Sequence, residues 1–126
     1  MSRWERSLEF RRLLEESPVI AAIKDETGLE RCLASDCQVV FILYGTICDI
    51  DSIVSRIHEA GKKAVVHLDL VGGMTPKEIS VDFIRTHTQA DGIISTRPNV
   101  IHYARQCGLL AIQRFFVIDS RALETA

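Results

Sequence analysis

The sequence of 126 residues lacks long hydrophobic runs. No apolar stretch approaches the roughly 20 residues that a membrane-spanning helix needs, so we predict no membrane association. Residues 1–16 mix arginines with glutamates and contain no apolar segment or cleavage site of the kind that a signal peptide has. We therefore expect a cytoplasmic protein that is not exported.

An excess of charge of one sign is also missing. Fifteen lysines and arginines stand against 17 aspartates and glutamates, which gives a formal net charge of -2. A protein that coats nucleic acid electrostatically usually carries a clear positive excess. Contact with RNA would therefore have to come from a local patch, an oligomer or a ligand-induced form.

The cysteines show neither the C-x-x-C spacing nor a histidine at zinc-finger spacing. They are Cys32, Cys37, Cys48 and Cys107. A structural metal or a disulfide framework therefore has little support. We expect reduced, mostly buried thiols, and we predict no metal and no other cofactor.

Short apolar, β-branched runs alternate with amphipathic stretches along the chain. The predicted strands cover residues 19–23, 39–43, 64–70, 92–95 and 109–117. This alternation is typical of an α/β fold with a parallel sheet, and the nearly continuous apolar runs indicate strands covered on both faces. A helix is expected before the first strand. We predict a single domain over residues 1–126.

Ligands of parallel α/β folds bind at the carboxyl ends of the strands. The candidate ligand-binding residues there are Lys24, His67, Asp69, Ser95, Thr96 and Arg114. The Arg114 guanidinium suits a pair of anionic oxygens, although an ion pair with Asp69 or Asp119 is the alternative. Lys24 fits a phosphate or carboxylate ligand and equally fits a surface lysine. Ser95 and Thr96 can bind an anion at a helix start or simply cap that helix.

His67 and Asp69 are two residues apart in a predicted strand, so we expect both to project to the same face. A polar residue inside an apolar run needs a partner, and a buried His–Asp hydrogen bond is one explanation. A general base oriented by a carboxylate is another. We favour a binding or structural role and predict no catalytic residue.

Several strings occur together in order from about residue 18 onward. They are Ala21-Ala22-Ile23-Lys24, Gly61-Lys62-Lys63 leading to His67-Leu68-Asp69-Leu70, Ala90-Asp91-Gly92-Ile93-Ile94-Ser95-Thr96, and Gln113-Arg114-Phe115-Phe116. With these strings the chain resembles the glycerol-3-phosphate-responsive antiterminator family, the glycerol uptake operon antiterminator regulators.

The resemblance implies a (β/α) TIM-barrel-like fold, of which about five of eight units are present here. It also implies a regulator that responds to glycerol 3-phosphate and acts on leader mRNA of glycerol-catabolic operons to prevent transcription termination, without enzymatic turnover. Family members continue through three further units, whose Gly-rich loops are expected to grip the phosphate. We expect a fragment, a truncated gene product or a chain completed by self-association as a homo-oligomer.

Two other functions stay open. One is a phosphosugar-handling TIM-barrel enzyme that uses His67 and Asp69 with Lys24 as acid-base groups. The other is an inactive remnant, which would aggregate or fail to unfold cooperatively, because an unclosed sheet leaves apolar surface and strand edges exposed.

Overall fold

The computed structural model describes residues 2–16 and 18–115. The helices are α1 (Arg3–Glu15), α2 (Glu26–Leu33), α3 (Ile50–Glu59), the 3-10 turn η1 (Leu68–Leu70), α4 (Glu78–His87) and α5 (Pro98–Gln106). The strands are β1 (Ile20–Ile23), β2 (Val39–Ile42), β3 (Lys63–His67), β4 (Gly92–Ser95) and β5 (Leu110–Gln113). Among the described residues, no helix combines the length and apolar character needed to cross a membrane.

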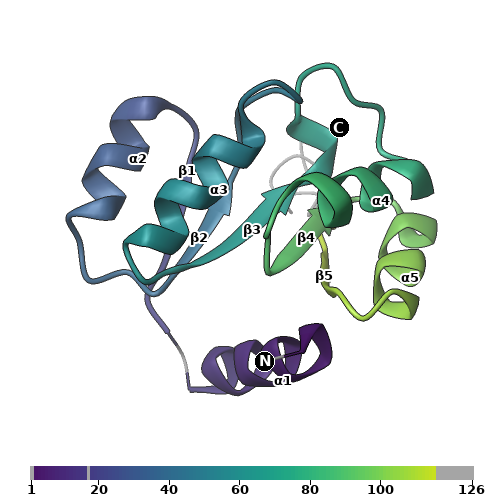
Figure 1. Ribbon diagram of the computed structural model, residues 1–126, viewed down its shortest axis with the longest axis horizontal. Helices are drawn as coiled ribbons and strands as arrows, with labels where there is room; N and C mark the ends of the chain where they lie inside the picture. The colour runs from purple at the N-terminus through teal and green to yellow at the C-terminus, as the bar shows by residue number, and fades with distance from the viewer. Residues whose placement is uncertain (1, 17, 116–126) are drawn as a thin grey trace, which may run out of the picture.

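The five strands form one parallel sheet in the order β1-β2-β3-β4-β5. Helices α2 to α5 contribute to one hydrophobic cluster with alternate strand residues, so they cover the same face of the sheet (Figure 1). Sequential order with helices on one face is the arrangement of a (β/α) barrel, whereas a doubly wound sheet reverses its order. The predicted α/β class, with five strand units after an N-terminal helix, is confirmed.

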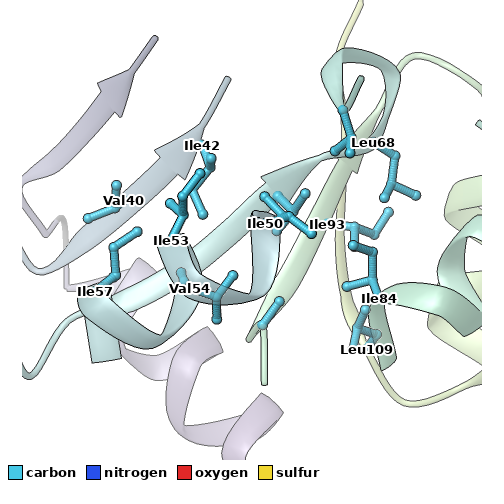
Figure 2. Packing of buried hydrophobic residues seen from close by; sticks show 14 of the residues in the cluster. Val40, Ile42, Ile50, Ile53, Val54, Ile57, Leu68, Ile84, Ile93 and Leu109 are labelled. Atoms are coloured by element: carbon cyan, nitrogen blue, oxygen red, sulfur yellow. The ribbon is translucent and has the colours of Figure 1, made fainter. Parts of the chain in front are cut away.

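Helix α3 shows how the helix-facing core is built. Ile53 and Ile57 lie one helical turn apart and point toward Val40 and Ile42 of β2 (Figure 2). All four side chains are almost completely buried. Side chains four positions apart share one side of a helix, so this short amphipathic pattern fixes which face of α3 meets the sheet.

The opposite face of the sheet, called the inner face here, packs against α1 near the amino ends of the strands (Figure 1). Phe10 of α1 is fully buried there against Val39, Val65, Ile94 and Leu110. Helix α1 therefore covers one end of the inner face and leaves its carboxyl end for side chains that follow the strands.

Two predicted strands are too long. The strand predicted over residues 64–70 ends at His67, and the chain then turns into η1. The strand predicted over residues 109–117 ends at Gln113, while residues 116 and 117, like Asp119, lie outside the described residues. The prediction that Asp69 belongs to the same strand as His67 is wrong, because Asp69 stands on η1. The alternation of side chains holds only inside a strand, so it cannot relate the directions of these two side chains.

Candidate functional site

A hollow of about 230 Å³ lies at the carboxyl ends of β3 and β5. It is lined by His67, Asp69, Leu70, Thr96, Arg114 and Phe115. A second hollow of about 280 Å³ on the inner face shares His67 and Arg114 with the first. Four of the six predicted ligand-binding residues therefore meet at one hollow, although three different segments of the chain supply them.

His67 is a buried polar residue at the end of β3, two positions after Val65 and on the same inner face. Its Nε2 atom lies 3.3 Å from Nη1 of Arg114. A guanidinium can only donate, so Nε2 accepts and a neutral ring carries its proton on Nδ1. Burial, assisted by the charge of Arg114, lowers the pKa of His67 although Asp69 opposes this. The ring is therefore neutral near pH 7.

The Nδ1 atom of His67 is buried and has no hydrogen-bond partner among the residues that the structure describes. A buried donor without a partner carries a desolvation cost of about 1–3 kcal/mol. Such groups are uncommon in folded proteins, and a binding site is one setting in which they occur.

Asp69 joins η1 to the end of β4. Its carboxylate accepts hydrogen bonds from Ser95 Oγ at 2.7 Å, from the Thr96 backbone N–H at 3.0 Å and from the Thr96 hydroxyl. Burial raises the pKa of Asp69, but these hydrogen bonds outweigh burial and the pKa is lowered overall. Asp69 is therefore ionised. A carboxylate has about four acceptor positions, so one more donor can still bind.

The two remaining predicted residues do not line either hollow. Ser95 is completely buried, and its hydroxyl donates to Asp69 while accepting from the backbone N–H of Arg97 at 3.1 Å. Ser95 thus positions Asp69 and the start of α5. Lys24 is exposed just after β1. The ligand roles of all six residues stay predictions.

The hydrogen bonds around His67 differ from the two pairings that the sequence suggested, a His67–Asp69 hydrogen bond and an Arg114–Asp69 ion pair. His67 contacts Arg114, and the Asp69 carboxylate accepts from Ser95 and Thr96. The backbone N–H of Arg114 donates to the Ser95 carbonyl at 2.9 Å, which continues the β4–β5 pairing and carries the guanidinium to His67. An Asp-oriented histidine base, as the enzyme interpretation requires, is not the observed arrangement.

Leu70 and Phe115 were missed as site residues. They are 45% and 71% exposed and line the hollow beside its polar groups. The signal that the sequence offered was an apolar residue directly after a predicted ligand-binding residue, since Leu70 follows Asp69 and Phe115 follows Arg114.

A larger hollow, of about 530 Å³, lies along α1. Its lining includes the three acidic residues Glu5, Glu9 and Glu16 together with Arg12 and Lys63. The three carboxylates outnumber the two cationic groups in this hollow, which disfavours an anionic ligand there.

Comparison with known proteins agrees with this fold. Residues 19–126 match the glycerol-3-phosphate responsive antiterminator family. The chain is 45% identical over 108 residues to the uncharacterised protein YgcP of Escherichia coli (strain K12), covering 86% of this chain and 56% of that protein.

Two solved structures are similar. The glycerol uptake operon antiterminator regulatory protein from Listeria monocytogenes str. 4b F2365 gives a TM-score of 0.77 at 36% identity, over 86% of this chain and 58% of that one. A glycerol uptake operon antiterminator-related protein from Thermotoga maritima MSB8 gives 0.72 at 30% identity, over 86% and 60%. The chain thus spans less than two thirds of the length of these relatives. It belongs to the glycerol-3-phosphate responsive antiterminator family.

Proposed function

We propose that this chain is a cytoplasmic regulator of glycerol catabolism that binds leader mRNA and prevents transcription termination in response to glycerol 3-phosphate. Family membership supports the regulatory role. The observation that carries the effector site is the meeting of Arg114, His67 and Asp69 at one hollow. We propose that the effector is bound and released unchanged, without a cofactor.

The phosphate of the effector would face Arg114. A guanidinium can donate two parallel hydrogen bonds to a pair of anionic oxygens. The exposure of Arg114 leaves its donors open to a ligand, and the Thr96 side chain lines the same hollow. Lys24, at the end of β1, stays a predicted second cation.

The glycerol portion would lie toward His67 and Asp69. A ligand oxygen beside the imidazole would give the unpaired Nδ1–H an acceptor, and a hydroxyl group could donate to the remaining acceptor position of Asp69. Leu70 and Phe115 would cover the carbon chain. The hollow, at about 230 Å³, is below the roughly 300–1,000 Å³ of sites for drug-sized ligands, which favours a small metabolite.

Isothermal titration calorimetry tests the effector site. We expect glycerol 3-phosphate to bind and glycerol to bind at least about tenfold more weakly, which corresponds to about 1.4 kcal/mol, because glycerol lacks the anionic oxygens. Arg114→Ala should lose affinity for glycerol 3-phosphate by a similar factor. Arg31→Ala removes an exposed arginine of α2 and is the matched control. Equal affinities in the two variants would refute the assignment of Arg114.

Leader RNA of a glycerol-catabolic operon tests the regulatory role. In filter binding, we expect glycerol 3-phosphate to change the affinity of the wild-type chain for this RNA and to have no effect on Arg114→Ala. If the chain unfolds cooperatively yet binds the RNA neither with nor without effector, antitermination by this chain is wrong, whatever the calorimetry shows.

A further inference from the structure

Two buried cysteines lie side by side between α2 and β2. Cys32 is in the last turn of α2, and Cys37 stands two residues before β2. Their Sγ atoms are 2.9 Å apart, and the two residues are 4% and 5% exposed. Both are free thiols in the structure.

The backbone between the two cysteines is held by hydrogen bonds. The Ser35 hydroxyl donates to the Cys32 carbonyl at 2.8 Å and accepts from the Cys37 backbone N–H at 3.2 Å. The buried Lys62 ammonium donates to the carbonyls of Ser35 at 2.8 Å and Cys37 at 2.7 Å. The short distance between the sulfur atoms is thus supported by an ordered turn, which Lys62 connects to the start of β3.

We propose that Cys32 and Cys37 form a site of oxidative modification, which closes to an intramolecular disulfide in the presence of a disulfide oxidant such as oxidised glutathione. An S–S bond is about 2.0 Å long, so the sulfur atoms need to approach by only about 0.9 Å. The site is separate from the effector hollow and independent of the proposed function.

The exchange is balanced in two steps. One cysteine thiolate attacks a sulfur of oxidised glutathione, and the glutathione thiolate that leaves takes up the proton. The second cysteine then attacks the protein sulfur of this mixed disulfide and displaces the other glutathione. In total, two protein thiols and one oxidised glutathione give one protein disulfide and two reduced glutathiones.

Burial slows the oxidation of the pair. Burial, followed by the hydrogen bond with Cys37, raises the pKa of Cys32 to about 12, while the nearby charge of Lys62 opposes this rise. The thiolate is the reactive form, so closure is slow near pH 7 and faster at higher pH. Replacing Lys62 with methionine removes the opposing charge and should slow closure further.

The test uses a variant in which Cys48 and Cys107 are serines, so that the pair alone carries thiols. This variant is incubated with oxidised glutathione, quenched with acid, unfolded and labelled with a maleimide before mass spectrometry. We expect two labels before oxidation and none afterwards, with a mass lower by two hydrogen atoms and no bound glutathione. Dithiothreitol should restore both labels.

A further Cys37→Ser substitution is the matched control, because Cys32 alone cannot close a ring. It should end with one label or one bound glutathione. In the wild-type chain the exposed Cys48 reports that the oxidant is active. Three results would each overturn the proposal: two retained labels in the test variant while Cys48 of the wild-type chain, treated in parallel, is glutathionylated; glutathione bound to both Cys32 and Cys37; or a disulfide-linked dimer. As a second readout, oxidation should raise the thermal midpoint of the test variant and should not raise that of the control.

Discussion

Replacing Asp69 with alanine should lower the free energy of unfolding by about 2–3 kcal/mol, because one carboxylate holds η1 to the end of β4. The side chain accepts three hydrogen bonds, from Ser95 and from the backbone and hydroxyl of Thr96. These bonds join two segments that are 26 or 27 residues apart.

The magnitude follows from what the substitution leaves behind. Hydrogen bonds to a charged group contribute about 1.5–3 kcal/mol each, but they are not additive and the unfolded carboxylate is well solvated. Thr96 is half-buried, so water can replace its lost partner. Ser95 is completely buried, and its unpaired hydroxyl costs about 1–3 kcal/mol. One lost charged hydrogen bond and one orphaned hydroxyl, with partial relaxation, give about 2–3 kcal/mol.

Urea denaturation followed by circular dichroism measures this difference. Asp36→Ala, at an exposed loop position, is the control and should change stability by less than about 0.5 kcal/mol. A loss for Asp69→Ala no larger than that of the control would refute the argument. The folded pKa of Asp69 is below its ordinary value of 3.8, so its contribution is present above pH 3.8 and is lost as the pH falls through the folded pKa. The gap between the wild type and Asp69→Ala should narrow there.

Three further predictions concern the stability of the fold. The pKa of His67 is lower in the folded chain than its ordinary value of 6.5, so as the pH falls the unfolded chain takes up a proton before the folded chain does. The free energy of unfolding should therefore decrease as the pH drops below 6.5. Urea titrations at several pH values should show a weaker pH dependence for His67→Gln. Phe10→Ala should cost about 3–5 kcal/mol and release α1, measured by urea denaturation and hydrogen exchange of α1, and unchanged exchange would contradict the packing. Gly92→Ala would place a Cβ atom 2.7 Å from the Leu110 carbonyl oxygen, so thermal denaturation should show a loss of about 1–3 kcal/mol, and a neutral effect would rule out that close approach.

Much of the fold could be predicted because it depends on local patterns. The run Gly92–Ser95 was predicted with the bounds that the structure gives it, and Val39 begins the second strand as expected. Errors occurred where an apolar sequence continues past the end of a strand. Residues 68–70 alternate like a strand, yet the chain turns there into η1, where Asp69 is hydrogen-bonded to Ser95 and Thr96. A partner so distant in the sequence leaves no local pattern.

The cysteines illustrate the same limit. The expectation of mostly buried thiols is right for Cys32 and Cys37, whereas Cys48 is exposed and Cys107 is partly exposed. Sequence spacing alone gave little support for a disulfide, since the two cysteines are five positions apart and form no C-x-x-C motif. The turn at Ser35 and the ammonium of Lys62 bring the two sulfur atoms together.

The sequence by itself determined the α/β class, the order of strands and helices and the family, because periodicity and ordered strings are properties of the chain alone. It also placed the candidate residues at the carboxyl ends of strands. Only the tertiary structure decided which of them meet. His67 and Arg114 are in contact although they are 47 positions apart in the sequence, and Ser95 donates a hydrogen bond to Asp69. Lys24 is exposed after β1 and does not line the hollow. Side-chain contacts depend on strand register and on where each strand ends, and these are set by packing against the rest of the molecule.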